Sequence, residues 1–462
     1  MILKESREVD FVPGQAPSLR VRADYVLQND GNGALAFIDV ILPAQKQFGR
    51  GDVHAKIDNR DARLVSLPVE YQQDSPNALR IPLDRPWAPK EKRRLSIEYF
   101  LSAPEDSGES ITLGPDNFYL GARGWFPLPQ PPKHIFAPYP KKPDRSAFVV
   151  GVPADFLVLG RGTPAGQKRE DGEIDHRFEL GKNDLSPFAV AGHYLESSHN
   201  APMGAVVFWT LQPPSGSLDT AANQIAGAWA TLLHEFGPLD KNIRFPHIVE
   251  SPEVHAHLPG DTGAAVVPFP GGALANSAAF ALGVDNAEFL EKVEHALAHN
   301  WFGDQMYPTP DAAIGIGEGL PDYATIVIDE AQNGEAGRRH RIVDLLREYD
   351  EARKQGVEKP VGLVAVNDPI EQRRIALAKA PLFYVYLEDT YGEQPIRTAL
   401  AKVVELFRGQ RVGYDDLRAA LEQTTGKNLA EAFRTWRYSK GIPADFRARY
   451  ESTPESAPAT QR

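Results

Sequence analysis

Two histidines and one glutamate form the pattern in this sequence that is best suited to chemistry. His295 and His299 lie four residues apart, and 18 residues separate His299 from Glu318. On a helix, the first spacing places both imidazoles on one face, one turn apart. Two imidazoles and a carboxylate suit a zinc ion whose fourth position stays open for water. We therefore predict one zinc per chain, bound by His295, His299 and Glu318.

The elements that must position these side chains are two predicted helices. The first runs over residues 286–302, with Asp285 as its N-cap and Glu288 as the capping-box partner. Gly303 is expected to end it, and the second helix opens at Glu318. Four apolar residues form the predicted buried stripe of the first helix: Leu290, Val293, Leu297 and Trp301.

The residues around this pattern resemble the gluzincin zinc aminopeptidases, the aminopeptidase N family. That family has His-Glu-x-x-His followed closely by Trp-Phe-Gly, and then Asn-Glu-Gly-Phe-Ala-x-Tyr at the same 18-residue spacing. The matching residues here are His295, His299, Trp301-Phe302-Gly303, Glu318-Gly319 and Tyr323. The stretches Phe245–Pro252 and Phe433–Pro443 are similar to the family as well.

The resemblance implies a fold and a cofactor. The expected fold is α+β and multidomain, with an N-terminal antiparallel β-saddle domain followed by a thermolysin-like, mostly helical metallopeptidase domain. The expected cofactor is zinc, and the expected activity is that of an aminopeptidase.

Three departures from the family each remove a chemical group. Ala296 stands where the family has the glutamate that acts as general base on zinc-bound water. Leu377 stands at the position of the family's transition-state tyrosine. The family's substrate-binding motif Gly-Ala-Met-Glu-Asn corresponds to Gly272, Ala273, Leu274, Ala275 and Asn276. Ala275 thus replaces the glutamate that holds the substrate's amino group.

These losses predict an impaired catalyst. A general acid–base group typically contributes on the order of 10²–10⁴-fold to the rate, and an oxyanion donor roughly 10²–10³-fold. Glu294 lies on the far side of the helix from position 296, and Glu291 lies one turn before His295 on roughly the ligand face. Neither has the family geometry of the general base. Several losses together favour natural decay over a single introduced change at Ala296.

Three functions stay open at this point. The favoured hypothesis is a degenerate homologue that binds zinc, and peptides or a protein partner in or around the old cleft. The second is an active zinc aminopeptidase with an unusual general base. The third is a scaffold without metal or peptide.

Other candidate residues carry weaker signals. Asp322, four residues after Glu318, is a candidate partner for a ligand histidine, and the alternative is a residue facing solvent. His255 and His257 would share one face of a strand, but they lie in what reads as an exposed loop. The run Arg338–Arg341 is expected to be a solvated helix face, and Trp301-Phe302 is expected to pack in the core.

Composition limits the class of protein. The chain has 462 residues, a formal net charge of −12 and no cysteine. The length predicts two or three domains, and the charge argues against nucleic acid or an anionic membrane surface as a partner. Any transition metal must use histidine and carboxylate ligands.

No apolar run approaches the roughly 18 residues of a membrane span, so we expect a soluble protein, either cytoplasmic or exported with its leader removed.

The pattern of polarity divides the chain. Residues 1–205 hold short alternating runs between turn residues, which predict antiparallel strands. Residues 206–448 are mostly helical around a small sheet, with a first helix expected over residues 218–236. Residues 449–462 are rich in small and polar residues and are expected to form a disordered tail.

Overall fold

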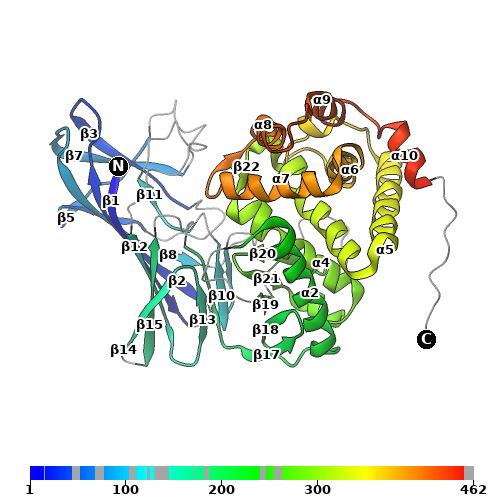
Figure 1. Cartoon of the computed structure of the whole chain (residues 1–462). Helices are drawn as coiled ribbons and strands as arrows, with labels where there is room; N and C mark the ends of the chain where they lie inside the picture. The colour runs from blue at the N-terminus through cyan, green and yellow to red at the C-terminus, as the bar shows by residue number, and fades with distance from the viewer. Residues whose placement is uncertain are drawn as a thin grey trace.

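The structure is a computed structural model that describes residues 1–14, 16–43, 52–67, 77–102, 111–121, 125–129, 145–170, 172–181, 187–239, 246–252, 254 and 263–451. It has a β-rich lobe and a helical lobe that lie side by side (Figure 1). The predicted tail beyond residue 451 and the pair His255 and His257 lie outside the described residues.

Three sheets build the β-rich lobe. The largest contains, in spatial order, β14 (Thr163–Glu170), β15 (Glu173–Gly181), β12 (Arg145–Pro153), β1 (Ile2–Val12), β2 (Ser18–Gln28), β8 (Lys92–Ser102), β4 (His54–Ile57) and β5 (Arg60–Ala62). The second contains β13 (Leu157–Gly160), β16 (Ala189–Gly192), β10 (Asn117–Leu120) and β9 (Ile111–Leu113). The third contains β11 (Leu128–Pro129), β3 (Leu35–Ile41), β7 (Ala78–Trp87) and β6 (Val65–Ser66).

The strands of this lobe follow the predicted alternation. In β2, every second side chain from Leu19 to Leu27 is buried, because successive side chains of a strand point to opposite faces of the sheet. Neighbouring strands in the three sheets are antiparallel, except that β1 and β12 run parallel. The predicted antiparallel β domain is therefore confirmed, with one parallel pair that alternation alone does not reveal.

The helical lobe packs around a five-stranded sheet. In spatial order this sheet contains β17 (Leu195–Ala201), β18 (Gly204–Thr210), β19 (His247–Glu250), β21 (Gly272–Ala275) and β20 (Val266–Phe269). The α-helices are α2 (Leu218–Phe236), α3 (Ser277–Ala281), α4 (Ala287–Ala298), α5 (Gly319–Gln355), α6 (Ile370–Tyr391), α7 (Glu393–Leu406), α8 (Tyr414–Thr425), α9 (Ala430–Tyr438) and α10 (Ala444–Glu451). Shorter elements are η2 (Asn300–Gln305), β22 (Tyr307–Pro308), η3 (Pro310–Ala312), η4 (Ala313–Glu318), η5 (Val361–Leu363) and β23 (Arg411–Val412).

The structure places the division between the lobes earlier than predicted. Residue 205 falls inside β18, and β17 already pairs with β18 in the sheet of the helical lobe. At the other end, α10 continues to Glu451 and passes the predicted limit at residue 448. The first difference arises because alternating polarity marks strands without saying which sheet they join.

Helix ends also differ from the prediction. Asn286, rather than Asp285, caps α4 by accepting a hydrogen bond from the Glu288 N–H. Asp285 instead accepts from the Ser217 N–H at the start of α2. Helix α4 stops at Ala298 and continues as the π-helical segment η2, so Gly303 does not end it. The buried stripe from Leu290 to Trp301 is confirmed.

Among the described residues, the contacts between the lobes include apolar packing and polar pairs. Tyr119 and Phe188 of the β-rich lobe pack against Phe269 of β20, with ring centroids 6.4 Å and 5.8 Å away. The Arg161 guanidinium lies 2.6 Å from the Asp304 carboxylate in η2, and the hydroxyls of Thr112 and Ser251 are 3.0 Å apart. The β-rich lobe is therefore fixed directly onto the segment that follows α4.

Among the described residues, no helix combines the length and apolar character needed to cross a membrane.

A buried ionic network joins the long helices behind the candidate site. The Glu388 carboxylate on α6 accepts hydrogen bonds from Tyr323 Oη at 2.5 Å, from Arg338 Nη1 at 2.7 Å and from Arg397 Nε at 2.7 Å. Tyr323 lies in the first turns of α5, and Arg397 lies on α7. The predicted solvated face at Arg338–Arg341 is thus wrong for Arg338, which is 5% exposed because it neutralises this carboxylate.

Replacing Glu388 by alanine should destabilise the protein by about 3–5 kcal/mol, because Arg338 and Arg397 would lose the more deeply buried of the two carboxylates that they share, Glu388 and Glu330. Glu393→Ala is the matched control, since Glu393 pairs with Arg397 at 3.1 Å but its side chain is 50% exposed; its cost should stay below about 1 kcal/mol. Urea unfolding measures both. Equal costs would show that the network does not hold α5, α6 and α7 together.

Candidate metal centre

Two neighbouring segments bring the predicted ligands together. His295 lies in the last turn of α4, and His299 follows that helix where it passes into η2. Glu318 ends η4 and immediately precedes α5. Both η2 and η4 are π-helical, and wider turns of this kind often occur at functional sites. The wider helical turns of η2 and η4 lie on either side of the loop that joins the two histidines to the glutamate.

The three ligand atoms form a compact triangle. The Nε2 atoms of His295 and His299 are 3.0 Å apart. Each lies 3.5 Å from Glu318 Oε2. A tetrahedral zinc ion with bonds of about 2.0–2.1 Å separates its ligand atoms by about 3.3 Å. The triangle would therefore fit one zinc ion, all three ligands line the same cleft, and among the described residues this is the group suited to a metal.

Asp322 orients the first of these histidines. Its Oδ1 lies 2.7 Å from His295 Nδ1, the nitrogen on the far side of the ring from Glu318. A carboxylate in this position holds the proton on Nδ1, which leaves Nε2 free to bind metal. The structure thus places Asp322 as a partner of His295, as the sequence suggested.

The charges of the site are balanced locally. Burial would lower the pKa of His295, but the carboxylates of Asp322 and Glu318 outweigh that effect and raise it to about 10. Burial would raise the pKa of Glu318, but the two imidazoles hold it well below its usual range. Because zinc binds the neutral imidazole, metal uptake must release the additional proton of His295.

The position next to the first histidine carries no acid–base group. Ala296 is fully buried in the apolar core of the helical lobe. Glu294 accepts a hydrogen bond from Gln332 on α5, and burial together with the charge of Asp329 raises its pKa to about 8. Glu291 pairs with Arg341 at 2.5 Å. Neither glutamate replaces the missing side chain, as predicted from their places on the helix.

A cleft of about 400 Å³ opens in front of the triangle. Its walls come from both lobes: Tyr119 and Gly121 from the β-rich lobe, and β20, η2, β22 and η4 from the helical lobe. The histidines and carboxylates among its described lining residues are His295, His299, Glu318 and Asp304, and Tyr119 and Tyr307 add two phenol groups. Asp304 was missed at the sequence level, because its place beside the cleft depends on its contact with Arg161 across the lobes.

The structure does not bring the predicted substrate-binding run to this cleft. Gly272–Ala275 form β21, which lies between β19 and β20, and all four residues are buried. Asn276 has a structural role: its Oδ1 accepts from the N–H groups of Ala265 and Ala279, and so it caps α3. Gly272–Asn276 thus lie outside the described lining of the cleft, where the lining strand is β20, and their role in substrate binding stays a prediction.

The remaining predicted position, Leu377, packs against a small apolar cluster that includes Ile314 and Val364. It is not among the residues that line the cleft. Trp301 and Phe302 are buried in the core, as predicted.

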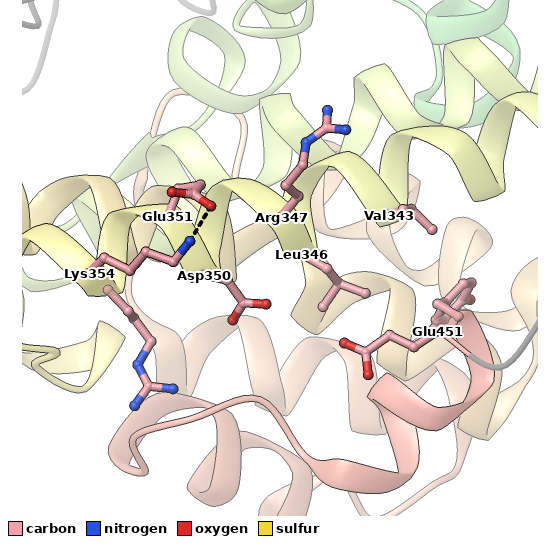
Figure 2. A pocket seen from close by; sticks show the side chains of 9 residues that line it. Val343, Leu346, Arg347, Asp350, Glu351, Lys354 and Glu451 are labelled. Atoms are coloured by element: carbon pink, nitrogen blue, oxygen red, sulfur yellow. Dashed lines mark hydrogen bonds and ion pairs between the residues drawn. The ribbon is translucent and has the colours of Figure 1, made fainter.

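A larger cavity of about 680 Å³ lies elsewhere, between α5 and α10 (Figure 2). Two of its charged side chains, Lys354 and Glu351, pair with each other at 2.5 Å, and Asp350 pairs with Arg447, which lies on α10 outside the lining. It contains none of the candidate metal ligands, so the chemistry of the chain lies in the smaller cleft.

Comparison with known proteins agrees with the resemblance found in the sequence. Residues 273–436 match the peptidase family M1 domain. Among curated proteins, none matches this sequence.

Solved structures share the whole fold at low identity. An M1 zinc metallopeptidase from Deinococcus radiodurans is 17% identical and superposes with a TM-score of 0.66, over 96% of this chain and 95% of that chain. A Glu-to-Ala mutant of the same organism's M1 zinc metallopeptidase, bound to a Tyr-Ser-Ala substrate, is 18% identical with a TM-score of 0.65 and the same coverage. The predicted arrangement of a β-rich domain and a metallopeptidase domain is thus confirmed at the level of the fold.

Removing the carboxylate behind His295 should weaken zinc binding. Asp322→Ala is expected to lower zinc affinity by about 10–100-fold, because the imidazole loses the partner that fixes its tautomer and ring orientation. Asp311→Ala is the control, since Asp311 is an exposed carboxylate that pairs with Arg437 at 3.3 Å. Competition with a chelating dye measures both affinities. Unchanged affinity in Asp322→Ala would show that this residue does not serve the metal.

Proposed function

We propose that this chain, whose residues 273–436 match the peptidase family M1 domain, binds zinc and peptides but has lost efficient hydrolysis. The observation that carries the proposal is an intact triangle of His295, His299 and Glu318 beside a buried alanine at position 296. The triangle supports metal binding. The alanine at position 296 lacks the general base that peptide hydrolysis most needs.

The missing step is a proton transfer. Zinc, when bound, lowers the pKa of its water toward 7 and polarises a carbonyl. A nearby base must still take the proton and deliver it to the leaving amine. The methyl group of Ala296 does neither, and the described carboxylates close to it have other partners.

Peptide binding is supported by the shape and chemistry of the cleft. In the sheet as the structure describes it, β20 is an edge strand that runs along the cleft, and aromatic side chains from both lobes line it. Extended peptides commonly add to such an edge through main-chain hydrogen bonds. The solved structure of the Deinococcus radiodurans Glu-to-Ala mutant contains a bound Tyr-Ser-Ala substrate. That protein therefore binds a peptide without this glutamate.

An active peptidase with a different base is the second candidate, and Asp304 is the observation that favours it. This carboxylate lines the cleft and follows His299 by five residues. However, Asp304 Oδ2 lies 2.6 Å from Arg161 Nη2, so this carboxylate is already held by a partner in the β-rich lobe. The geometry therefore favours the binding function over turnover.

Restoring a glutamate at position 296 tests this proposal. The zinc-loaded wild type should release almost no fluorophore from aminoacyl substrates, whereas Ala296→Glu should raise the rate on the order of 10²-fold or more by supplying the base. Ala296→Gln is the matched control, because its amide has a similar size and cannot accept the proton. Turnover is measured with and without chelator, and thermal unfolding checks that both variants fold.

Rapid wild-type turnover that chelator abolishes would contradict the loss of catalysis. Equal rates in Ala296→Glu and Ala296→Gln would show that the missing base is not what limits the chain.

A further inference from the structure

The helical turn that begins at His299 is wider than a turn of an α-helix. The Asp304 N–H donates to the His299 carbonyl at 2.9 Å, five residues back, whereas an α-helix bonds residues four apart. The preceding bond, from the His299 N–H to the His295 carbonyl, is already long at 3.4 Å. The ligand helix therefore loosens at His299, and the place of this imidazole depends on what holds the turn that follows.

This wide turn presses the backbone of Gly303 against the His299 side chain. A Cβ added to Gly303 would lie 3.5 Å from His299 Cβ and 3.0 Å from its Nδ1. In an α-helix, Cβ atoms four residues apart are separated by about 5–6 Å. Gly303 therefore supports the imidazole closely only while the turn keeps its wide form.

The β-rich lobe supplies a contact that holds the turn. Arg161 directly follows β13, and its Nη2 lies 2.6 Å from Asp304 Oδ2, with the two side chains only 5% and 12% exposed. Arg161 is itself fixed, because its N–H donates to the Phe188 carbonyl at 3.2 Å and its guanidinium lies over the Phe188 ring. A hydrogen bond between charged groups is strong where water is excluded. The contact can therefore keep Asp304, and with it the wide turn, in place.

We propose that Arg161 is a positioning residue for the metal centre: by holding Asp304 it keeps the wide turn that fixes the His299 imidazole. This inference rests on the zinc binding proposed above. It gives the β-rich lobe a part in metal affinity, although none of the three ligands belongs to that lobe.

Charge alone predicts a different result. Removing the Arg161 cation would strengthen the attraction of the site for Zn²⁺, and removing the Asp304 carboxylate would weaken it. If the pair acts by positioning His299, loss of either partner weakens zinc binding. The sign of the effect in an Arg161 variant therefore separates the two explanations.

The experiment measures the zinc dissociation constant of the full chain by competition with a chelating dye. Arg161→Met and Asp304→Ala should each bind zinc about tenfold more weakly than wild type. The double variant should bind no more weakly than either single variant, because both changes break the same contact. The visible absorption of the Co²⁺-loaded protein should also change in all three, since it reports the geometry of the ligands.

Thr112→Val is the matched control. It removes the hydroxyl pair of Thr112 and Ser251, which also links the two lobes but does not involve η2. It should therefore keep the wild-type zinc affinity and Co²⁺ spectrum. Thermal unfolding checks that each variant folds. If a single variant fails to fold because it leaves a buried charge without its partner, the double variant, whose net charge equals that of wild type, provides the test.

The outcomes separate this inference from the proposed function. Unchanged or tighter zinc binding in Arg161→Met with an unchanged Co²⁺ spectrum, or the same loss of affinity in Thr112→Val, would overturn the role of Arg161. Losses that add in the double variant would overturn it as well. In each of these cases the wild-type zinc site still stands, whereas a wild type that binds no zinc would contradict the proposed function itself.

Discussion

The structure depends on one geometric requirement: three side chains from two segments must meet within 3.5 Å of one another. His295 and His299 satisfy part of it through the turn of a single helix, but Glu318 arrives from a separate segment. The two π-helical segments, η2 and η4, flank the connection that brings it there. Gly303 leaves room for the second imidazole, since a Cβ at that position would lie 3.0 Å from His299 Nδ1. Asn300, which follows His299, accepts from the Gly271 N–H at 2.6 Å and so ties the ligand helix to the turn between β20 and β21.

The ligand triad could be predicted from sequence because it follows from helical periodicity and one fixed spacing. The β-rich half and most helices could be predicted for the same reason. The residues that line the cleft could not be predicted from sequence, because they depend on the order of strands in the sheet. Two short apolar runs follow each other along the chain, Val266–Phe269 and Gly272–Ala275, and only the sheet shows that the first is the edge strand. Pro268 was the available signal, since proline is confined to edge strands. Arg338 could not be predicted to be buried, because Glu388 lies 50 residues away in sequence.

The site separates binding from chemistry. Its metal ligands, the carboxylate behind His295 and the open strand edge have all been kept in position, whereas position 296 is a buried methyl group. Zinc, if bound by these ligands, would supply polarisation of a carbonyl, whereas Ala296, in the part of the chain that the structure describes, offers no group for proton transfer. The same fold that supports hydrolysis in other proteins can therefore serve recognition here, with the β-rich lobe forming one wall of the cleft through Tyr119 and Gly121.

The central claim is that His295, His299 and Glu318 form a working zinc site. The most direct test is the zinc content of the purified chain after dialysis against limiting zinc, by elemental mass spectrometry, for wild type and for His295→Ala. The account predicts about one zinc per chain in wild type and a value near zero in the folded variant. Wild type without zinc, or a variant that keeps it, would contradict the account.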